Sequence, residues 1–158
     1  MAIISAFQAS RPKDHKHWGV DLSAPIGTPI YANMAMTVLR YFANWSYGPV
    51  LELQDTYNTK YILAHLDWSP LTPGKAIKVG DLVGYSGEGG NAANTIPHTH
   101  YEVRILGTGP QGQVDPTGTD SNTSKPYTSA FGYIRAGNTL LSTSATAIGE
   151  TLSTYRVY

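Results

Sequence analysis

Short runs of β-branched and aromatic residues, separated by Gly, Pro, Asn and Asp, fill the first 120 residues of the chain. Such runs predict β-strands, and their close spacing favours antiparallel pairing over parallel strands joined by helices. No stretch in this part has the 3.6-residue period of an amphipathic helix. The expected strands are Pro29–Ala32, Met36–Ala43, Val50–Gln54, Lys60–Leu66, Ala76–Val79, Leu82–Ser86 and His98–Leu106. We therefore predict an all-β fold, an antiparallel β-sandwich or open barrel.

The composition changes near residue 120. Residues 118–125 form a linker rich in Gly, Ser, Thr, Asp and Asn, and residues 142–154 are rich in Ser, Thr and Ala. Between them, residues 127–141 contain enough apolar side chains to form a strand or to dock on the main body. We expect one domain over residues 1–120 and a C-terminal extension of unassigned role over residues 121–158.

Composition and charge exclude several classes of protein. The chain has 11 acidic and 11 basic residues, so it lacks the cationic excess of a nucleic-acid-binding face. It has no cysteine, which rules out disulfides, thiolate metal ligands and cysteine nucleophiles. No apolar run approaches the roughly 18 residues of a membrane-spanning helix. Any zinc site must be built from His, Asp or Glu.

The five histidines fall into three clusters, His15/His17, His65 and His98/His100. His17 is followed by Asp21, and the Gly- and Pro-containing segment 24–29 after them excludes a long helix. On extended chain, residues an even number apart share a face, so these two side chains are expected to point the same way. A neutral imidazole and a carboxylate together are suitable as half of a zinc site.

In the expected strand that begins at His98, the side chains of His98, His100 and Glu102 share one face. Each histidine alone is more often a surface or structural residue than a ligand. The combination of all the clusters in one small β domain favours a metal site held in a groove.

The longer motifs resemble a known family. They are residues 17–32, 61–67, 79–90 and 97–103, followed by Val-Asp-Pro at 114–116. In this order, across residues 15–116, they resemble the lysostaphin-type zinc endopeptidases, which cut the peptide part of bacterial peptidoglycan. The joint occurrence of several motifs in order is far more specific than any one of them.

The resemblance implies one zinc ion per chain, bound by His17, Asp21 and His100. It implies catalytic roles for His65 and His98, and leaves open which of them is the general base. The expected reaction is hydrolysis of peptide cross-links or stem peptides of peptidoglycan by a metal-activated water. Glu102 is a candidate for supporting a zinc ligand or for a purely structural carboxylate. His15 has no assured counterpart in the family.

Two departures from the family pattern concern substrate contacts rather than the metal. Leu63 stands where the family usually has an aromatic residue, and Gly48-Pro49 stands where it commonly has Gly-Asn. Five aromatic residues are candidates for lining a groove, with ordinary sheet packing as the alternative: Trp18, Trp45, Tyr47, Trp68 and Tyr85. Residues 84–90 are expected to form a loop beside the groove.

Two other functions remain open from the sequence. One is a non-catalytic peptidoglycan-binding or virion structural module that keeps the fold. The other is a carrier domain of the sugar-phosphotransferase or biotinyl type, since residues 79–84 resemble those domains too. A biotinyl carrier would need a modifiable lysine in a tight hairpin, which is not seen, and a phosphocarrier has no need of Asp21.

The expected place of action is the bacterial cell wall. The N-terminal residues lack the basic and apolar regions of a signal peptide. We therefore expect delivery by a bacteriophage, as a virion-associated or lysis protein, with residues 121–158 available to dock on other virion subunits.

Overall fold

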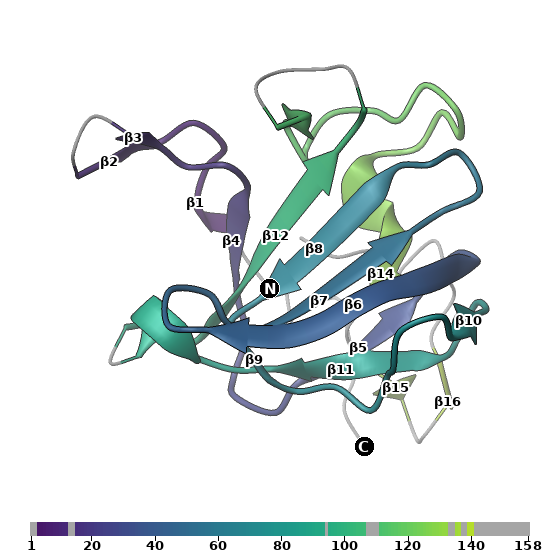
Figure 1. Cartoon of the computed structure of the whole chain (residues 1–158), viewed down its shortest axis with the longest axis horizontal. Helices are drawn as coiled ribbons and strands as arrows, with labels where there is room; N and C mark the ends of the chain where they lie inside the picture. Colours follow the sequence, from purple (N-terminus) through teal and green to yellow (C-terminus); the bar gives the residue numbers. More distant parts are fainter. Residues whose placement is uncertain are drawn as a thin grey trace.

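The computed structural model describes residues 3–12, 15–93, 95–106, 111–132, 135–136 and 139–140. Two antiparallel sheets build the molecule (Figure 1). The larger sheet has the order β1 (Ile3–Ser5), β4 (Val20–Ser23), β12 (His98–Arg104), β8 (Lys60–Ala64), β7 (Gly48–Gln54), β6 (Met36–Asn44) and β10 (Ala76–Ile77), with β13 (Gln113–Val114) also paired to β12. The smaller sheet has the order β14 (Phe131–Gly132), β5 (Pro29–Ala32), β11 (Leu82–Ser86) and β9 (Leu66–Trp68).

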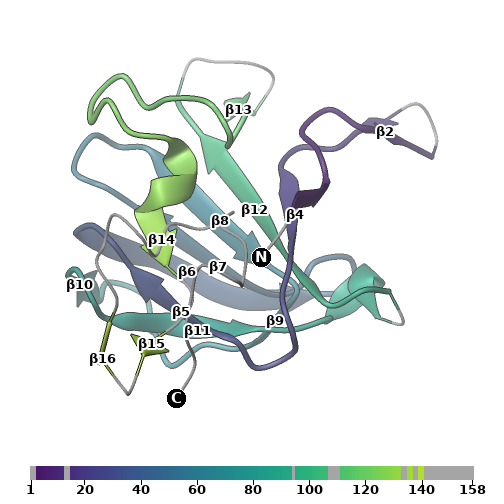
Figure 2. The same ribbon diagram turned by 180° about the vertical axis from the view of Figure 1, so that it is seen from behind.

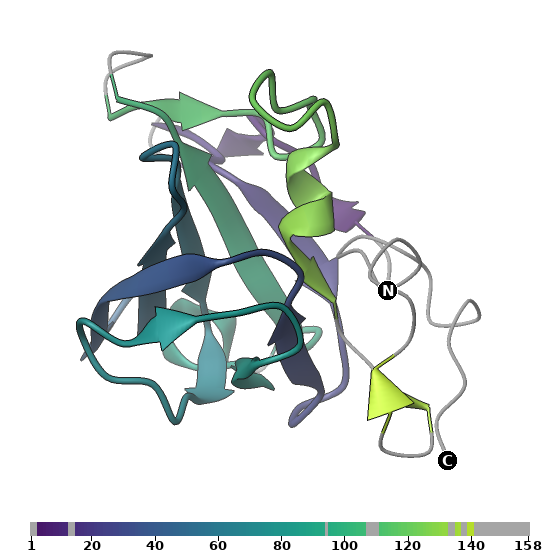
Figure 3. The same ribbon diagram turned by 90° about the vertical axis from the view of Figure 1, so that its right-hand side faces the viewer.

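Two short hairpins and two 3-10 turns complete the described chain. The first hairpin joins β2 (Ser10–Arg11) to β3 (His15–Lys16) and projects beside β4 (Figure 1). The second joins β15 (Arg135–Ala136) to β16 (Thr139–Leu140) and is set apart from the two sheets (Figure 3). The turns are η1 (Gly90–Ala92) and η2 (Tyr127–Ala130). These ranges contain no α-helix, so none could cross a membrane, and the prediction of an antiparallel all-β fold is confirmed.

The strands follow the sequence pattern closely. Pro29–Ala32 and Leu82–Ser86 have the predicted bounds as β5 and β11. The predicted strand Lys60–Leu66 is instead divided at His65, whose φ of 60° ends β8 and redirects the chain into β9 of the other sheet. A left-handed backbone conformation is uncommon for a residue other than glycine, and the alternation of apolar residues does not predict it.

The core lies between the sheets. On β12 the side chains alternate, and Tyr101 and Val103 are fully buried in the core while the histidines lie on the opposite face. Tyr61 stacks on Tyr101 with 6.4 Å between ring centroids, and Phe131 meets both rings edge to face. This packing joins β8 and β12, the strands that carry the site, to β14 of the smaller sheet.

The first part of the expected C-terminal extension contributes to this core. Figure 2 shows η2 leading into β14, which pairs with β5. Phe131 has no exposed surface, and burial of a side chain of that size contributes about 1.5–3 kcal/mol. The division of the chain at residue 120 stays a prediction, and residues 141–158 lie outside the described residues.

Candidate metal centre

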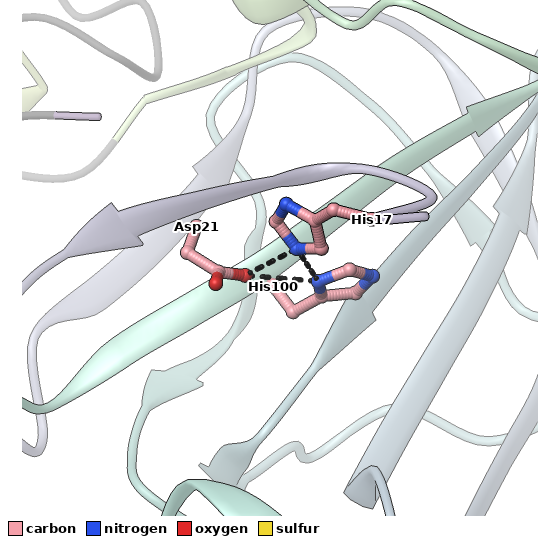
Figure 4. A group of neighbouring side chains, drawn as sticks. All are labelled: His17, Asp21 and His100. Carbon is pink, nitrogen blue, oxygen red and sulfur yellow. Dashed lines mark hydrogen bonds and ion pairs between the residues drawn. The ribbon is translucent and has the colours of Figure 1, made fainter. Parts of the chain in front are cut away.

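The pairing of β4 with β12 places Asp21 directly opposite His100. His17 lies four residues earlier, where the chain crosses β12 through Gly19. A Cβ atom at Gly19 would collide with the carbonyl oxygen of Tyr101 and lie 2.9 Å from Cγ of Glu102. Only glycine allows this close crossing, and the crossing brings His17 to the other two side chains (Figure 4).

Gly19→Ala is therefore expected to push the chain away from β12 and displace His17. We expect a loss of about 1–3 kcal/mol in the free energy of unfolding, the usual cost of overpacking, together with weaker zinc binding. Thermal unfolding and zinc titration measure the two effects. Gly118→Ala is the matched control, because its added Cβ would meet one atom only, at 3.1 Å, a contact that a shift of a few tenths of an ångström relieves. Equal behaviour of the two variants would contradict the role assigned to the crossing.

Three ligand-type atoms converge at this point. Nε2 of His17 lies 3.0 Å from Oδ1 of Asp21 and 3.0 Å from Nδ1 of His100. Nδ1 of His100 lies 2.9 Å from the same Asp21 oxygen. All three residues are largely buried. The structure thus brings together the three residues predicted as ligands.

This triangle fits zinc. Bond lengths of about 2.0–2.2 Å and tetrahedral angles separate neighbouring ligand atoms by roughly 3.3–3.5 Å. The observed separations are a few tenths of an ångström shorter, so a small outward shift would admit the ion. Three protein ligands leave the fourth tetrahedral position to water or substrate, as in catalytic zinc sites.

The outer nitrogen of each imidazole has its own acceptor. Nδ1 of His17 donates to the carbonyl oxygen of Ala6 at 2.8 Å, and Nε2 of His100 donates to Oε1 of Glu102 at 2.8 Å. In each neutral ring this bond fixes the proton on the outer nitrogen, so the inner nitrogen can bind a metal.

The site strongly favours a positive charge at its centre. Burial would raise the pKa of Asp21, but hydrogen bonds from His100 and His17 hold it far below its ordinary value. Burial alone would lower the pKa of His100, yet hydrogen bonds to Asp21 and Glu102 outweigh it and raise the pKa to about 8. The same surroundings that stabilise a proton here suit a divalent cation.

Glu102 is fully buried and holds several groups at once. Besides His100, it accepts a hydrogen bond from the hydroxyl of Tyr47 and two from Arg104, at 2.9 and 2.6 Å. Burial opposes ionisation, but the hydrogen bond from His100, the charges of His100 and Arg104, and the hydrogen bond from Tyr47 lower the pKa of Glu102. The carboxylate is thus ionised, and it orients the ring of His100.

The other two predicted histidines lie beside the triangle. The rings of His65 and His98 have centroids 5.0 Å apart, and Nε2 of His98 lies 3.8 Å from Oδ1 of Asp21. Nδ1 of His65 donates to Gly89 and Nδ1 of His98 donates to Ile96, each at 2.8 Å. In both histidines, Nε2 is therefore the ring nitrogen available for proton transfer.

His65 is held in its unusual backbone conformation by its neighbours. The backbone N–H of His65 donates to the carbonyl oxygen of Tyr47 at 2.8 Å. Gly87 packs against the other side, where an added Cβ would lie only 2.8 Å from the carbonyl oxygen of His65. Burial, together with the nearby charges of His100 and His98, lowers the pKa of His65 to about 4. A neutral imidazole at neutral pH can accept a proton.

The five histidines all line one cleft of about 820 Å³. His15 is the exposed one among them, whereas the other four are buried. Of the candidate aromatics, Trp18 and Tyr47 line the cleft, whereas Trp68 stacks on Tyr85 on the smaller sheet. Residues 84–90, expected as a loop, begin as part of β11, and the carbonyl oxygen of Gly89 then accepts the hydrogen bond from His65.

The sequence did not predict the roles of three groups at the site. Tyr47 was treated only as a groove aromatic, although its hydroxyl binds Glu102. Arg104 continues the alternation of His98, His100 and Glu102 along β12, and that pattern could have indicated it. Arg11 contacts Asp21 from the N-terminal hairpin, and no motif spacing points to it.

Comparison with known proteins places this geometry in context. Residues 15–116 match the family model described as peptidase family M23. Peptidoglycan DD-endopeptidase ShyC of Vibrio cholerae is 36% identical over 93 residues, covering 58% of this chain and 21% of that protein. Lysostaphin of Staphylococcus staphylolyticus is 29% identical over 133 residues, covering 80% of this chain and 25% of that protein.

Solved structures show the same fold. The structure of LytU superposes with a TM-score of 0.64 at 34% identity, covering 73% of this chain and 81% of that one. The chain spans about a quarter or less of the length of the curated relatives named above, so the match concerns a domain of each of them.

Proposed function

The chain belongs to peptidase family M23, and from this we propose that it is a zinc-dependent endopeptidase that hydrolyses peptide cross-links or stem peptides of bacterial peptidoglycan. The family is zinc-dependent and its characterised relatives are peptidoglycan endopeptidases. The observation that carries the proposal is the convergence of His17, Asp21 and His100 within a cleft that also holds two further histidines.

His17, Asp21 and His100 would hold the zinc ion. When bound, zinc polarises a carbonyl group and lowers the pKa of a coordinated water to about 7. His65 and His98 would orient the attacking water and move its proton through their Nε2 atoms, since Nδ1 of each is fixed on a backbone carbonyl. Once a ring has taken up that proton, its Nε2–H can donate to the oxygen that becomes negative in the transition state. With zinc in place of the inner proton of His100, Glu102 would accept the hydrogen bond from the outer nitrogen and keep the ring oriented toward the metal.

Digestion of purified peptidoglycan is the direct test. We expect muropeptide fragments from the wild-type protein, no fragments after chelation, and recovery on addition of about one zinc per chain. Walls with different cross-bridges, followed by sizing of the fragments, identify the bond. The name of ShyC makes a D-amino-acid cross-link the first bond to examine. Zinc binding without cleavage of any wall would favour the alternative, a non-catalytic peptidoglycan-binding or virion structural module.

Delivery by a bacteriophage is a separate proposal. It places the protein in the virion or among lysis proteins, with residues 121–158 contacting other virion subunits. Mass spectrometry of purified particles tests it, because a virion-borne protein must be present at a defined copy number.

A further inference from the structure

The two carboxylate oxygens of Asp21 have different partners. Oδ1 faces Nε2 of His17 and Nδ1 of His100, at 3.0 and 2.9 Å. Oδ2 faces Nη2 of Arg11, at 3.4 Å. One oxygen therefore points at the centre of the triangle, and the other points toward a guanidinium on the N-terminal hairpin.

Arg11 is itself held in place. Its Nη2 donates to Oγ of Ser5 at 2.7 Å, and Ser5 lies opposite Asp21 in the pairing of β1 with β4. The backbone of Arg11 pairs with His15 in the β2–β3 hairpin. Oγ of Ser5 also lies 3.3 Å from Nδ1 of His17. A short network from residues before 15, where the family match begins, thus reaches two of the three proposed ligands.

We propose that Arg11 is a positioning residue of the metal centre, which holds Oδ2 of Asp21 outward so that Asp21 offers zinc Oδ1 alone. The inference rests on the proposed function only in taking zinc as the metal. A carboxylate free to turn could offer both oxygens and occupy the position needed by water or substrate. The guanidinium fork suits this task because its donors are fixed in one plane.

Two effects of Arg11 on the metal oppose each other. Its charge withdraws electron density from Asp21 and repels a cation, which weakens zinc binding. Its hydrogen bond orients the ligand, which strengthens binding. The side chain of Arg11 is 30% exposed and that of Asp21 only 12%. Water screens the charge effect of an exposed guanidinium, whereas the orientation of a nearly buried carboxylate is not relaxed by water. Orientation is the larger effect.

Zinc affinity of the Arg11 variants tests the proposal without any peptidase assay. Arg11→Met removes both the charge and the hydrogen bond, and is expected to raise the zinc dissociation constant about 10–100-fold, as for other outer partners of metal ligands. Arg11→Gln keeps a neutral donor and is expected to lie between Arg11→Met and wild type. Competition with a chromogenic chelator gives the dissociation constants. Cobalt substitution adds a second readout, since its visible absorption changes with coordination number.

Arg40→Met is the matched control, because Arg40 also binds a carboxylate, Glu52 at 2.8 Å, but lies outside the cleft. It is expected to leave the zinc dissociation constant unchanged. Ser5→Ala is the second variant. It removes the hydroxyl that holds Arg11 but keeps the arginine, so it should also raise the zinc dissociation constant. Thermal unfolding of the metal-free proteins shows that each variant folds.

Zinc binding by Arg11→Met equal to or tighter than wild type, with an unchanged cobalt spectrum, would overturn the proposal. That outcome leaves the proposed peptidase function standing. Absence of zinc binding by the wild-type protein would overturn both, and loss of peptidoglycan cleavage alone would leave the role of Arg11 intact.

Discussion

The His65→Ala and His98→Ala proteins are expected to bind zinc as the wild-type protein does and to lose peptidoglycan hydrolysis by about 10²–10⁴-fold. A positioned acid–base group contributes a rate factor of that size. Neither histidine supplies an atom to the triangle of His17, Asp21 and His100, so the metal should remain.

The two variants need not be equal. His98 lies nearer to the triangle, with Nε2 at 3.8 Å from Asp21, while His65 is the ring whose pKa is lowered to about 4 by burial and by the nearby His100 and His98. The variant that lacks the proton-accepting ring should lose more of the hydrolysis rate than the variant that lacks the water-orienting ring. The slower of the two variants therefore identifies the general base. Rates of fragment release from one purified wall, at matched zinc occupancy, give the comparison.

His15→Ala serves as the control for zinc content. His15 is an exposed residue of the cleft, and neither of its ring nitrogens belongs to the triangle. The His15→Ala protein is expected to retain about one zinc per chain. Full hydrolytic activity in the His98→Ala protein would contradict the catalytic role of that histidine.

Local sequence pattern was sufficient for most of the fold. Pro29–Ala32 and Leu82–Ser86 are short apolar runs with clear turn residues on both sides, and the structure has the predicted bounds. The alternation after His98 correctly predicted that His98, His100 and Glu102 share a face, because β12 is regular. The corner at His65 could not be predicted, since it depends on Tyr47 and Gly87 packing around a left-handed residue.

The site was predictable in its ligand set and not in its supporting contacts. His17, Asp21 and His100 belong to motifs with fixed spacing, so a resemblance identifies them. The hydroxyl of Tyr47 donates to Glu102, which lies 55 residues further along the chain. The two residues come together because β7, β8 and β12 are neighbours in one sheet. Arg11 reaches Asp21 through a hairpin outside the motifs.

Loss of a ligand should have the second largest effect, and Asp21→Asn isolates it with little change of shape. Asparagine keeps an oxygen and the volume of Asp21 but removes the negative charge that the buried site uses to stabilise a cation. We expect the zinc dissociation constant to rise by at least 100-fold, and peptidoglycan hydrolysis to be lost at a zinc concentration that saturates the wild-type protein.

Thermal unfolding with and without zinc measures this binding through stability. A ligand present at 100 times its dissociation constant stabilises the folded state by about 2.7 kcal/mol, which for a domain of this size raises the midpoint by roughly 5–10 °C. Wild type and His98→Ala should show that increase, and Asp21→Asn should not. Asp67→Asn, at an exposed acid of β9 outside the cleft, should behave as wild type. A zinc-dependent increase of wild-type size in Asp21→Asn would show that the ion binds elsewhere, because no other change in that protein compensates for the missing carboxylate.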